Sequence, residues 1–158
     1  MRNLVFALLI LFLASSAFQN PENKASEPGE NAAALQPEKK EDGVLIHISG
    51  GEDDAHKVLM PLKMASIMAE DKKVLIYLDI EAPNLVINSA EDVTHQHFPS
   101  LKEQLDDLIS NENVEIMVCP TCLKVAGYDE AYLIDGVELA DKKKMFNFVD
   151  GRIITLDY

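Results

Sequence analysis

The alternation of short apolar runs with longer amphipathic segments is the feature that most restricts the fold of this chain. Apolar runs rich in β-branched residues occur at Val44–Ile48, Lys73–Asp79 and Val114–Val118, and helical segments are predicted between them. Near-continuous apolar strands that alternate with helices are typical of parallel sheets with both faces covered. The pattern therefore predicts an α/β domain with a mostly parallel sheet.

The helical segments have recognisable ends. Asp53 or Asp54 is suited to cap the first helix, and Pro61 predicts either a kink or a regular start near Leu59. The segment Ser100–Glu103 has the pattern of a capping box for a second helix. Further along, the sequence predicts a long loop, a capped turn, a short strand or extended segment, a last helix and a final strand, at residues 80–99, 129–133, 134–139, 142–148 and 152–156.

The only two cysteines of the chain, Cys119 and Cys122, directly follow the third apolar run with C-x-x-C spacing. Pro120 has a φ suited to the first turn of a helix, so Cys119 is predicted near a helix N-cap and Cys122 one turn further in. Free N–H groups there favour the thiolate, the nucleophilic form of cysteine. Both are therefore candidate catalytic residues. The alternative is a structural disulfide or two packed thiols; a zinc site lacks the second ligand pair that it would need.

The expected topology brings further residues close to the cysteines. The carboxyl ends of parallel strands meet at one edge of a sheet, where ligands and reactive groups gather. Asp79 and the Gly50–Gly51 turn fall at such ends, as does Cys119. We therefore expect one crevice, with Gly50, Gly51, Asp79, Pro120 and Thr121 as candidate residues beside the cysteines.

Neither a cofactor nor a metal ion is expected in this crevice. The Gly50–Gly51 turn lacks the motifs of phosphate loops, and Glu52–Asp54 places three carboxylates where a phosphate would lie. His47 alternates with the apolar residues of the first run. We interpret it as a core or edge histidine with satisfied hydrogen bonds and not as a metal ligand.

The beginning of the chain has the three parts of a secretory signal. Arg2 is followed by the apolar run Leu4–Leu13 and by the small residues Ser15–Ala17. The run is short for a membrane span, so no stable membrane anchor is expected, and no cysteine follows it for lipid attachment. We expect export to the periplasm or the medium. The expected organisation is a signal peptide, a disordered linker and one domain, at residues 1–17, 18–42 and 43–158.

Charge excludes one class of partner. The chain has 27 acidic and 14 basic residues and a net charge of −13. Residues 43–158 hold 21 acidic against 10 basic side chains, a net charge of −11, so the acidity belongs to the expected domain. A field of this sign disfavours nucleic acids and anionic lipid surfaces. No nucleic-acid partner is expected.

Together these features resemble the DsrE/DsrF-like superfamily, which includes the TusD and YchN-like proteins. The resemblance covers essentially all of residues 43–158. It rests on the order of a Gly-Gly-acidic turn after the first strand, Phe98–Leu101 opening a helix, a strand ending in Cys119, Leu133–Val137, and the terminal run Ile153–Tyr158. It implies a flavodoxin-like three-layer α/β sandwich with a mostly parallel sheet of about four or five strands.

The resemblance also implies a homotrimer or homohexamer, and the apolar patch Leu85–Ile87 in the long loop is consistent with assembly. In the sulfur-relay members a cysteine carries sulfur as a persulfide, and the matching position here is Cys119. The relay members are cytosolic and do not require a second cysteine at the position of Cys122.

The leading hypothesis is an exported sulfur-handling protein. Cys119 accepts sulfur or forms a mixed disulfide, and Cys122 resolves it. The expected partner is a sulfur donor or acceptor protein or a small thiol. One alternative is a thiol–disulfide oxidoreductase that uses the same pair. Another is an oligomeric module that binds a small ligand or Cu(I), because Met60, Met64 and Met68 share one helix face; such a stripe is more commonly core.

Overall fold

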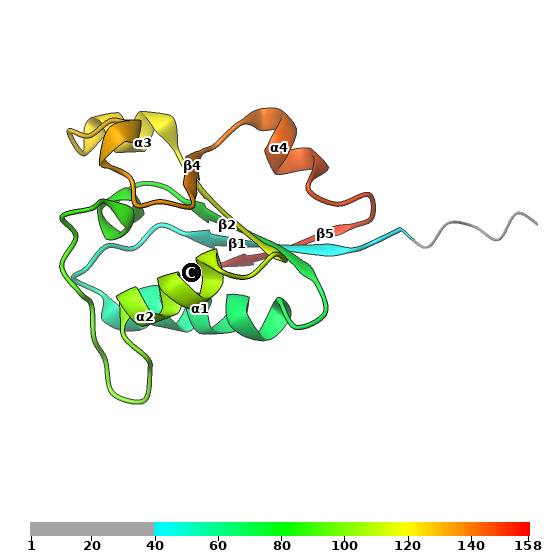
Figure 1. Ribbon diagram of the computed structural model, residues 1–158, viewed down its shortest axis with the longest axis horizontal. Coiled ribbons are helices and arrows are strands. Elements are labelled where there is room, and N and C mark those ends of the chain that lie inside the picture. Colours follow the sequence, from blue (N-terminus) through cyan, green and yellow to red (C-terminus); the bar gives the residue numbers. More distant parts are fainter. Residues whose placement is uncertain (1–39) are drawn as a thin grey trace, which may run out of the picture. The chain divides into compact units, whose positions relative to one another are not determined.

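The computed structural model of the protein describes residues 40–158, which form five parallel strands with helices between them (Figure 1). The elements, in chain order, are β1 (Gly43–Ile48), α1 (Ala55–Met68), β2 (Lys73–Leu78), the 3-10 helix η1 (Ala82–Val86), α2 (Leu101–Ile109), β3 (Val114–Val118), α3 (Pro120–Val125), the 3-10 helix η2 (Glu130–Tyr132), β4 (Val137–Leu139), α4 (Lys142–Asn147) and β5 (Ile153–Asp157). No helix in this part of the chain is both long enough and apolar enough to span a bilayer.

The strand order is β4-β3-β2-β1-β5, so the three apolar runs form the three central strands. The predicted α/β, flavodoxin-like class with a parallel sheet is confirmed. The expected signal peptide and nearly all of the expected linker lie outside the described residues. At the linker's end, the Glu41 carbonyl accepts a hydrogen bond from Gly151, and Asp42 pairs with Arg152 next to β5.

One face of the sheet, here called the α1–α2 face, carries the hydrophobic core. Figure 1 shows α1 and α2 side by side along this face. Alternate side chains of the central strands point toward these helices, and they are fully or almost fully buried with their helical neighbours. Members of this core include Val44, Ile46, Ile48, Val58, Leu62, Val74, Ile76, Leu105 and Ile116.

The opposite face, here called the α4 face, is covered less completely. It carries His47, Tyr77 and Met117, which are paired in register across β1, β2 and β3. The helix that crosses this side, α4, has only six residues and none of them is buried. Polar side chains on the α4 face therefore remain accessible near the strand ends.

The helix ends confirm the predicted caps. The Asp54 side chain accepts from the Lys57 N–H at the start of α1, and Ser100 and Glu103 form a complete capping box on α2. Pro61 lies inside α1, which begins at Ala55. The alternative of a regular start near Leu59 is therefore wrong.

The apolar patch in the long loop is part of the core. Leu85, Val86 and Ile87 are 5%, 1% and 5% exposed, and the first two belong to η1. The patch is buried within the domain itself, so the interpretation that it contributes to assembly is wrong.

Candidate functional site

The two cysteines lie at the turn between β3 and α3, at the carboxyl edge of the sheet. Cys119 is the N-cap residue of α3, and its sulfur accepts a hydrogen bond from the Cys122 N–H over 3.4 Å. The Cys119 N–H extends the sheet by donating to the Leu78 carbonyl over 2.8 Å. Pro120 is the first residue of α3. Both cysteines are free and half-buried. The predicted turn is confirmed.

Hydrogen bonding gives the two thiols opposite pKa shifts. Burial opposes ionisation of Cys119, but hydrogen bonds from the Cys122 thiol and N–H outweigh it and lower the pKa of Cys119. The Tyr77 hydroxyl and the Thr121 N–H add to this lowering. The pKa of Cys122 is raised, first by its hydrogen bond to Cys119 and then by burial. Cys119 is therefore the thiol that ionises first.

The end of β2 brings two further groups to Cys122. The negative charge of Asp79 raises the pKa of this thiol, and the Ile80 N–H, which donates to the sulfur, lowers it. Ile80 has a φ of 51°, in the left-handed region that β-branched residues rarely adopt, and its side chain is 63% exposed. Asp79 thus lies beside the thiols, as expected from the sequence, whereas Ile80 was not a candidate.

The other predicted crevice residues divide into two groups. Pro120 and Thr121 belong to the cysteine turn itself. Gly50 and Gly51 lie at the same edge of the sheet, where Gly50 is next to the side chain of Lys57 and Gly51 is next to that of Glu81.

His47 and Tyr77 are the polar residues near the thiols that the sequence interpretation did not assign to the site. Tyr77 is paired in register with Met117, two residues before Cys119, so its side chain lies on the same face of the sheet as that of Cys119. Burial, and then hydrogen bonding with the Cys119 thiol, raise the pKa of Tyr77. The His47 ring stacks on Tyr77 with a centroid distance of 5.7 Å and an interplanar angle of 29°. The sequence contained a signal for this pair. His47 and Tyr77 are the second-last residues of β1 and β2, and these two strands are neighbours.

His47 lies between two carboxylates. Its Nε2 is 2.8 Å from an Asp79 oxygen, and its Nδ1 is 2.6 Å from an Asp157 oxygen. Burial lowers the pKa of His47, but hydrogen bonds to Asp79 and then Asp157 outweigh it, so the pKa is raised above its ordinary value. The interpretation of His47 as a histidine with satisfied hydrogen bonds is consistent with these contacts.

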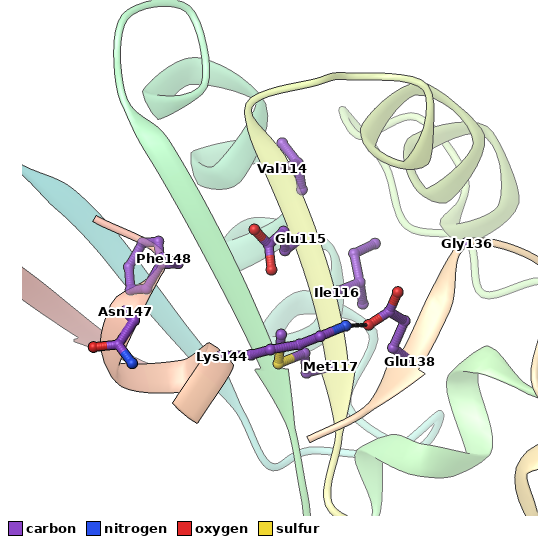
Figure 2. Close-up of a pocket in the computed structure, with 9 residues that line it drawn as sticks. All are labelled: Val114, Glu115, Ile116, Met117, Gly136, Glu138, Lys144, Asn147 and Phe148. Atoms are coloured by element: carbon purple, nitrogen blue, oxygen red, sulfur yellow. Dashed lines mark hydrogen bonds and ion pairs between the residues drawn. The ribbon is translucent and has the colours of Figure 1, made fainter. Parts of the chain in front are cut away.

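A groove of about 440 Å³ lies elsewhere on the α4 face, between β3, β4 and α4. Figure 2 shows Glu115 and Met117 of β3 facing it, with Lys144 paired to Glu138 across it. Neither cysteine lines this groove. The groove and the thiol site are therefore separate features of the same face.

The methionine stripe is part of the packing of α1. Met64 and Met68 pack against the core, and the stripe lies on a different element from the cysteine turn. Among residues 40–158, no group of three or more His, Cys, Asp or Glu side chains is arranged to hold a metal ion. These methionines therefore give no support to a Cu(I) site shared with the cysteines.

Two solved structures have a similar fold. The YchN protein of E. coli is 19% identical with a TM-score of 0.57, and the similarity covers 73% of this chain and 99% of that protein. The protein MTH1491 of Methanobacterium thermoautotrophicum, of unknown function, is 18% identical with a TM-score of 0.52, covering 75% and 99%.

Sequence comparison extends this similarity. The uncharacterized protein MJ0760 of Methanocaldococcus jannaschii is 28% identical over 128 residues, which are 80% of this chain and 45% of that protein. The chain thus spans less than half the length of this relative. Residues 42–152 match the model of the DsrE/DsrF-like family. The resemblance inferred from the sequence is confirmed, and the chain belongs to the DsrE/DsrF-like family.

Proposed function

We propose that this protein handles sulfur through the Cys119–Cys122 pair. The DsrE/DsrF-like family is in general related to sulfur relay. The observation that carries the proposal is the direct contact between two free cysteines whose thiols have opposite pKa shifts. A thiolate next to a protonated partner thiol is the arrangement needed for attack by one sulfur and later resolution by the other.

In the loading step, the Cys119 thiolate attacks the outer sulfur of a persulfide donor, R–S–SH. A new S–S bond forms at Cys119 as the donor's S–S bond breaks, and R–S⁻ leaves. The sulfane sulfur is transferred without net oxidation or reduction. An acceptor thiolate then removes the outer sulfur by the same exchange.

Cys122 offers a second outcome. Its thiolate attacks the Cys119 sulfur of the persulfide and releases HS⁻, with formation of a Cys119–Cys122 disulfide. The two thiols are oxidised and the sulfane sulfur is reduced to sulfide, so a dithiol reductant must then restore the pair.

Intact-mass spectrometry of the reduced chain tests this proposal. Exposure to polysulfide, without later reductant, is expected to add one sulfur atom or to produce the internal disulfide with release of sulfide. Protein alkylated beforehand at both cysteines is the control and should not change. Loading by a labelled disulfide but not by polysulfide would favour a thiol–disulfide oxidoreductase. No change with either reagent would contradict both functions.

Export and assembly form part of the same proposal. The signal-like sequence of residues 1–17 supports export, and the family supports a homotrimer or homohexamer. For protein recovered from a bacterial host, the intact mass is expected to lack residues 1–17, and light scattering is expected to give a multiple of three chains. A mass that retains Met1, or a monomer at micromolar concentration, would contradict the respective part.

A further inference from the structure

Four side chains lie on one face of the sheet at its carboxyl edge, the edge at which β3 is followed by Cys119. His47 of β1 is paired in register with Tyr77 of β2 and with Asp157 of β5. Asp79 follows the end of β2, two residues beyond Tyr77, and therefore lies on the same side. The group therefore spans the carboxyl ends of β2, β1 and β5, which are neighbouring parallel strands. In open α/β sheets, ligands and reactive groups gather at the carboxyl ends of the strands.

Contacts fix the charge state within this group. Both ring nitrogens of His47 face carboxylate oxygens, at 2.8 Å from Asp79 and 2.6 Å from Asp157. A neutral imidazole has only one N–H, so both contacts are hydrogen bonds only in the imidazolium form. Its position over the Tyr77 ring, with centroids 5.7 Å apart, is within the range of a cation–π interaction.

Tyr77 connects this cation to the sulfur of Cys119. Tyr77 is paired in register with Met117, two residues before Cys119, so the side chains of Tyr77 and Cys119 are diagonal neighbours on the same face of the sheet. From this position the Tyr77 hydroxyl contributes to lowering the pKa of Cys119. Tyr77 is half-buried, and its ring stacks on the His47 ring, which two carboxylates hold in place. These contacts restrict the movement of Tyr77 away from Cys119. A phenol held next to a thiolate donates a charge-assisted hydrogen bond, which is stronger than a bond between neutral groups.

We propose that Tyr77 donates a hydrogen bond to the reacting sulfur of Cys119, and that His47, fixed by Asp79 and Asp157, is the positioning residue that holds Tyr77 in place. The inference rests on the proposed function. In the loading step, Tyr77 stabilises the thiolate before attack and keeps its own proton throughout. No proton is transferred, and the stoichiometry of the exchange is unchanged.

The contacts from His47 through Tyr77 to Cys119 are here called the hydrogen-bond path. The charged and titratable groups around this path set its pH dependence. Cys119 faces Tyr77 from the β2 side and Cys122 from α3, and the charge of Asp79 acts on Tyr77 and on Cys122. His47 faces Tyr77, Asp79 and Asp157. When His47 loses its proton it loses one carboxylate hydrogen bond and the cation over the Tyr77 ring. The charge of Asp79 is then no longer compensated. Both effects disfavour the thiolate, so the path is expected to weaken as pH rises through the raised pKa of His47.

The test measures the rate at which iodoacetamide alkylates Cys119 as a function of pH, in a Cys122→Ser background of the full chain. Tyr77→Phe is expected to raise the midpoint of this profile by about one pH unit, the loss of one hydrogen bond to a charged group. Below the midpoint, alkylation would be about tenfold slower. Tyr132→Phe is the matched control, since Tyr132 is 51% exposed and its ring packs at a tilted angle of 56° against Tyr128 instead; the midpoint of this variant is expected to stay unchanged.

His47→Gln and Asp157→Asn test the positioning role. Each is expected to raise the midpoint by less than Tyr77→Phe does. In a Tyr77→Phe background, His47→Gln is expected to shift the midpoint by a smaller amount. The remaining shift comes from the charge of Asp79, which no longer has the His47 cation beside it. Equal shifts of His47→Gln with and without Tyr77 would overturn the positioning role. An unchanged midpoint in Tyr77→Phe would overturn the proposal as a whole.

Alkylation requires no sulfur donor, which separates this inference from the proposed function. A shifted midpoint without polysulfide loading would support the hydrogen-bond path and contradict sulfur transfer. Polysulfide loading together with an unshifted midpoint would support sulfur transfer and contradict the hydrogen-bond path. Urea denaturation of each variant shows whether a changed midpoint comes from altered folding, and Asp157→Asn, at a 72% exposed side chain, is the variant least disruptive to the fold.

Discussion

Replacement of Cys119 by serine is expected to abolish sulfur loading, because this residue provides the thiol with the lowered pKa. Serine keeps the size and the N-cap capacity of the side chain, so the start of α3 is expected to survive. The remaining thiol, Cys122, has a raised pKa and is a poor nucleophile near neutral pH. After exposure to polysulfide, the intact mass of Cys119→Ser is therefore expected to remain that of the unloaded chain.

Cys122→Ser is expected to have the opposite effect and to trap the adduct. Without the second thiol, the persulfide or mixed disulfide on Cys119 has no internal group to resolve it. The adduct should accumulate and should be released by added dithiol. Val125→Ala, at an 83% exposed position of the same helix, is the control and is expected to behave like the parent. Loading of Cys119→Ser but not of Cys122→Ser would show that the order is reversed.

The sequence was sufficient for the architecture and for the thiol pair because both depend on local patterns. Apolar runs determine which segments become central strands, and a proline after Cys119 determines where α3 begins. The C-x-x-C spacing alone places the Cys119 sulfur one helical turn from the Cys122 N–H. No information about distant residues was needed for these predictions.

The remainder of the site depends on register, which a single sequence does not give. His47 and Tyr77 meet because β1 and β2 pair residue by residue from Gly43 and Lys73, and Asp157 joins them from a strand 110 residues away. The apolar patch of the long loop illustrates the same difficulty. The apolar composition of Leu85–Ile87 predicts that this segment packs against another apolar surface. Only the three-dimensional course of the chain determines that this surface is the core of its own domain.

Substitutions on the two faces of the sheet are expected to differ in their effect on the free energy of unfolding. Two neighbouring residues of β2 test this difference. Ile76→Ala, on the α1–α2 face, is expected to lower the free energy of unfolding by about 2–5 kcal/mol, as is usual for loss of a large aliphatic side chain from a core. Ile76 is fully buried in the central strand, and the helices above it leave little room for the cavity to close. Such a loss would be a large part of the total stability of about 5–15 kcal/mol typical of domains.

Tyr77→Phe, the next residue along but on the α4 face, is expected to change the free energy of unfolding by no more than about 1 kcal/mol, since it removes one hydroxyl and leaves the ring stacked on His47. Ile154→Ala, at a 54% exposed position of β5, is the control for the aliphatic substitution and is expected to cost less than Ile76→Ala. Urea denaturation of the three variants measures all three values. A loss in Tyr77→Phe as large as that in Ile76→Ala would mean that the α4 face also carries the core. The side chains around Cys119 would then be constrained mainly by folding. A large difference would mean that the α4 face is free to hold polar groups at the thiol because the α1–α2 face supplies most of the stability.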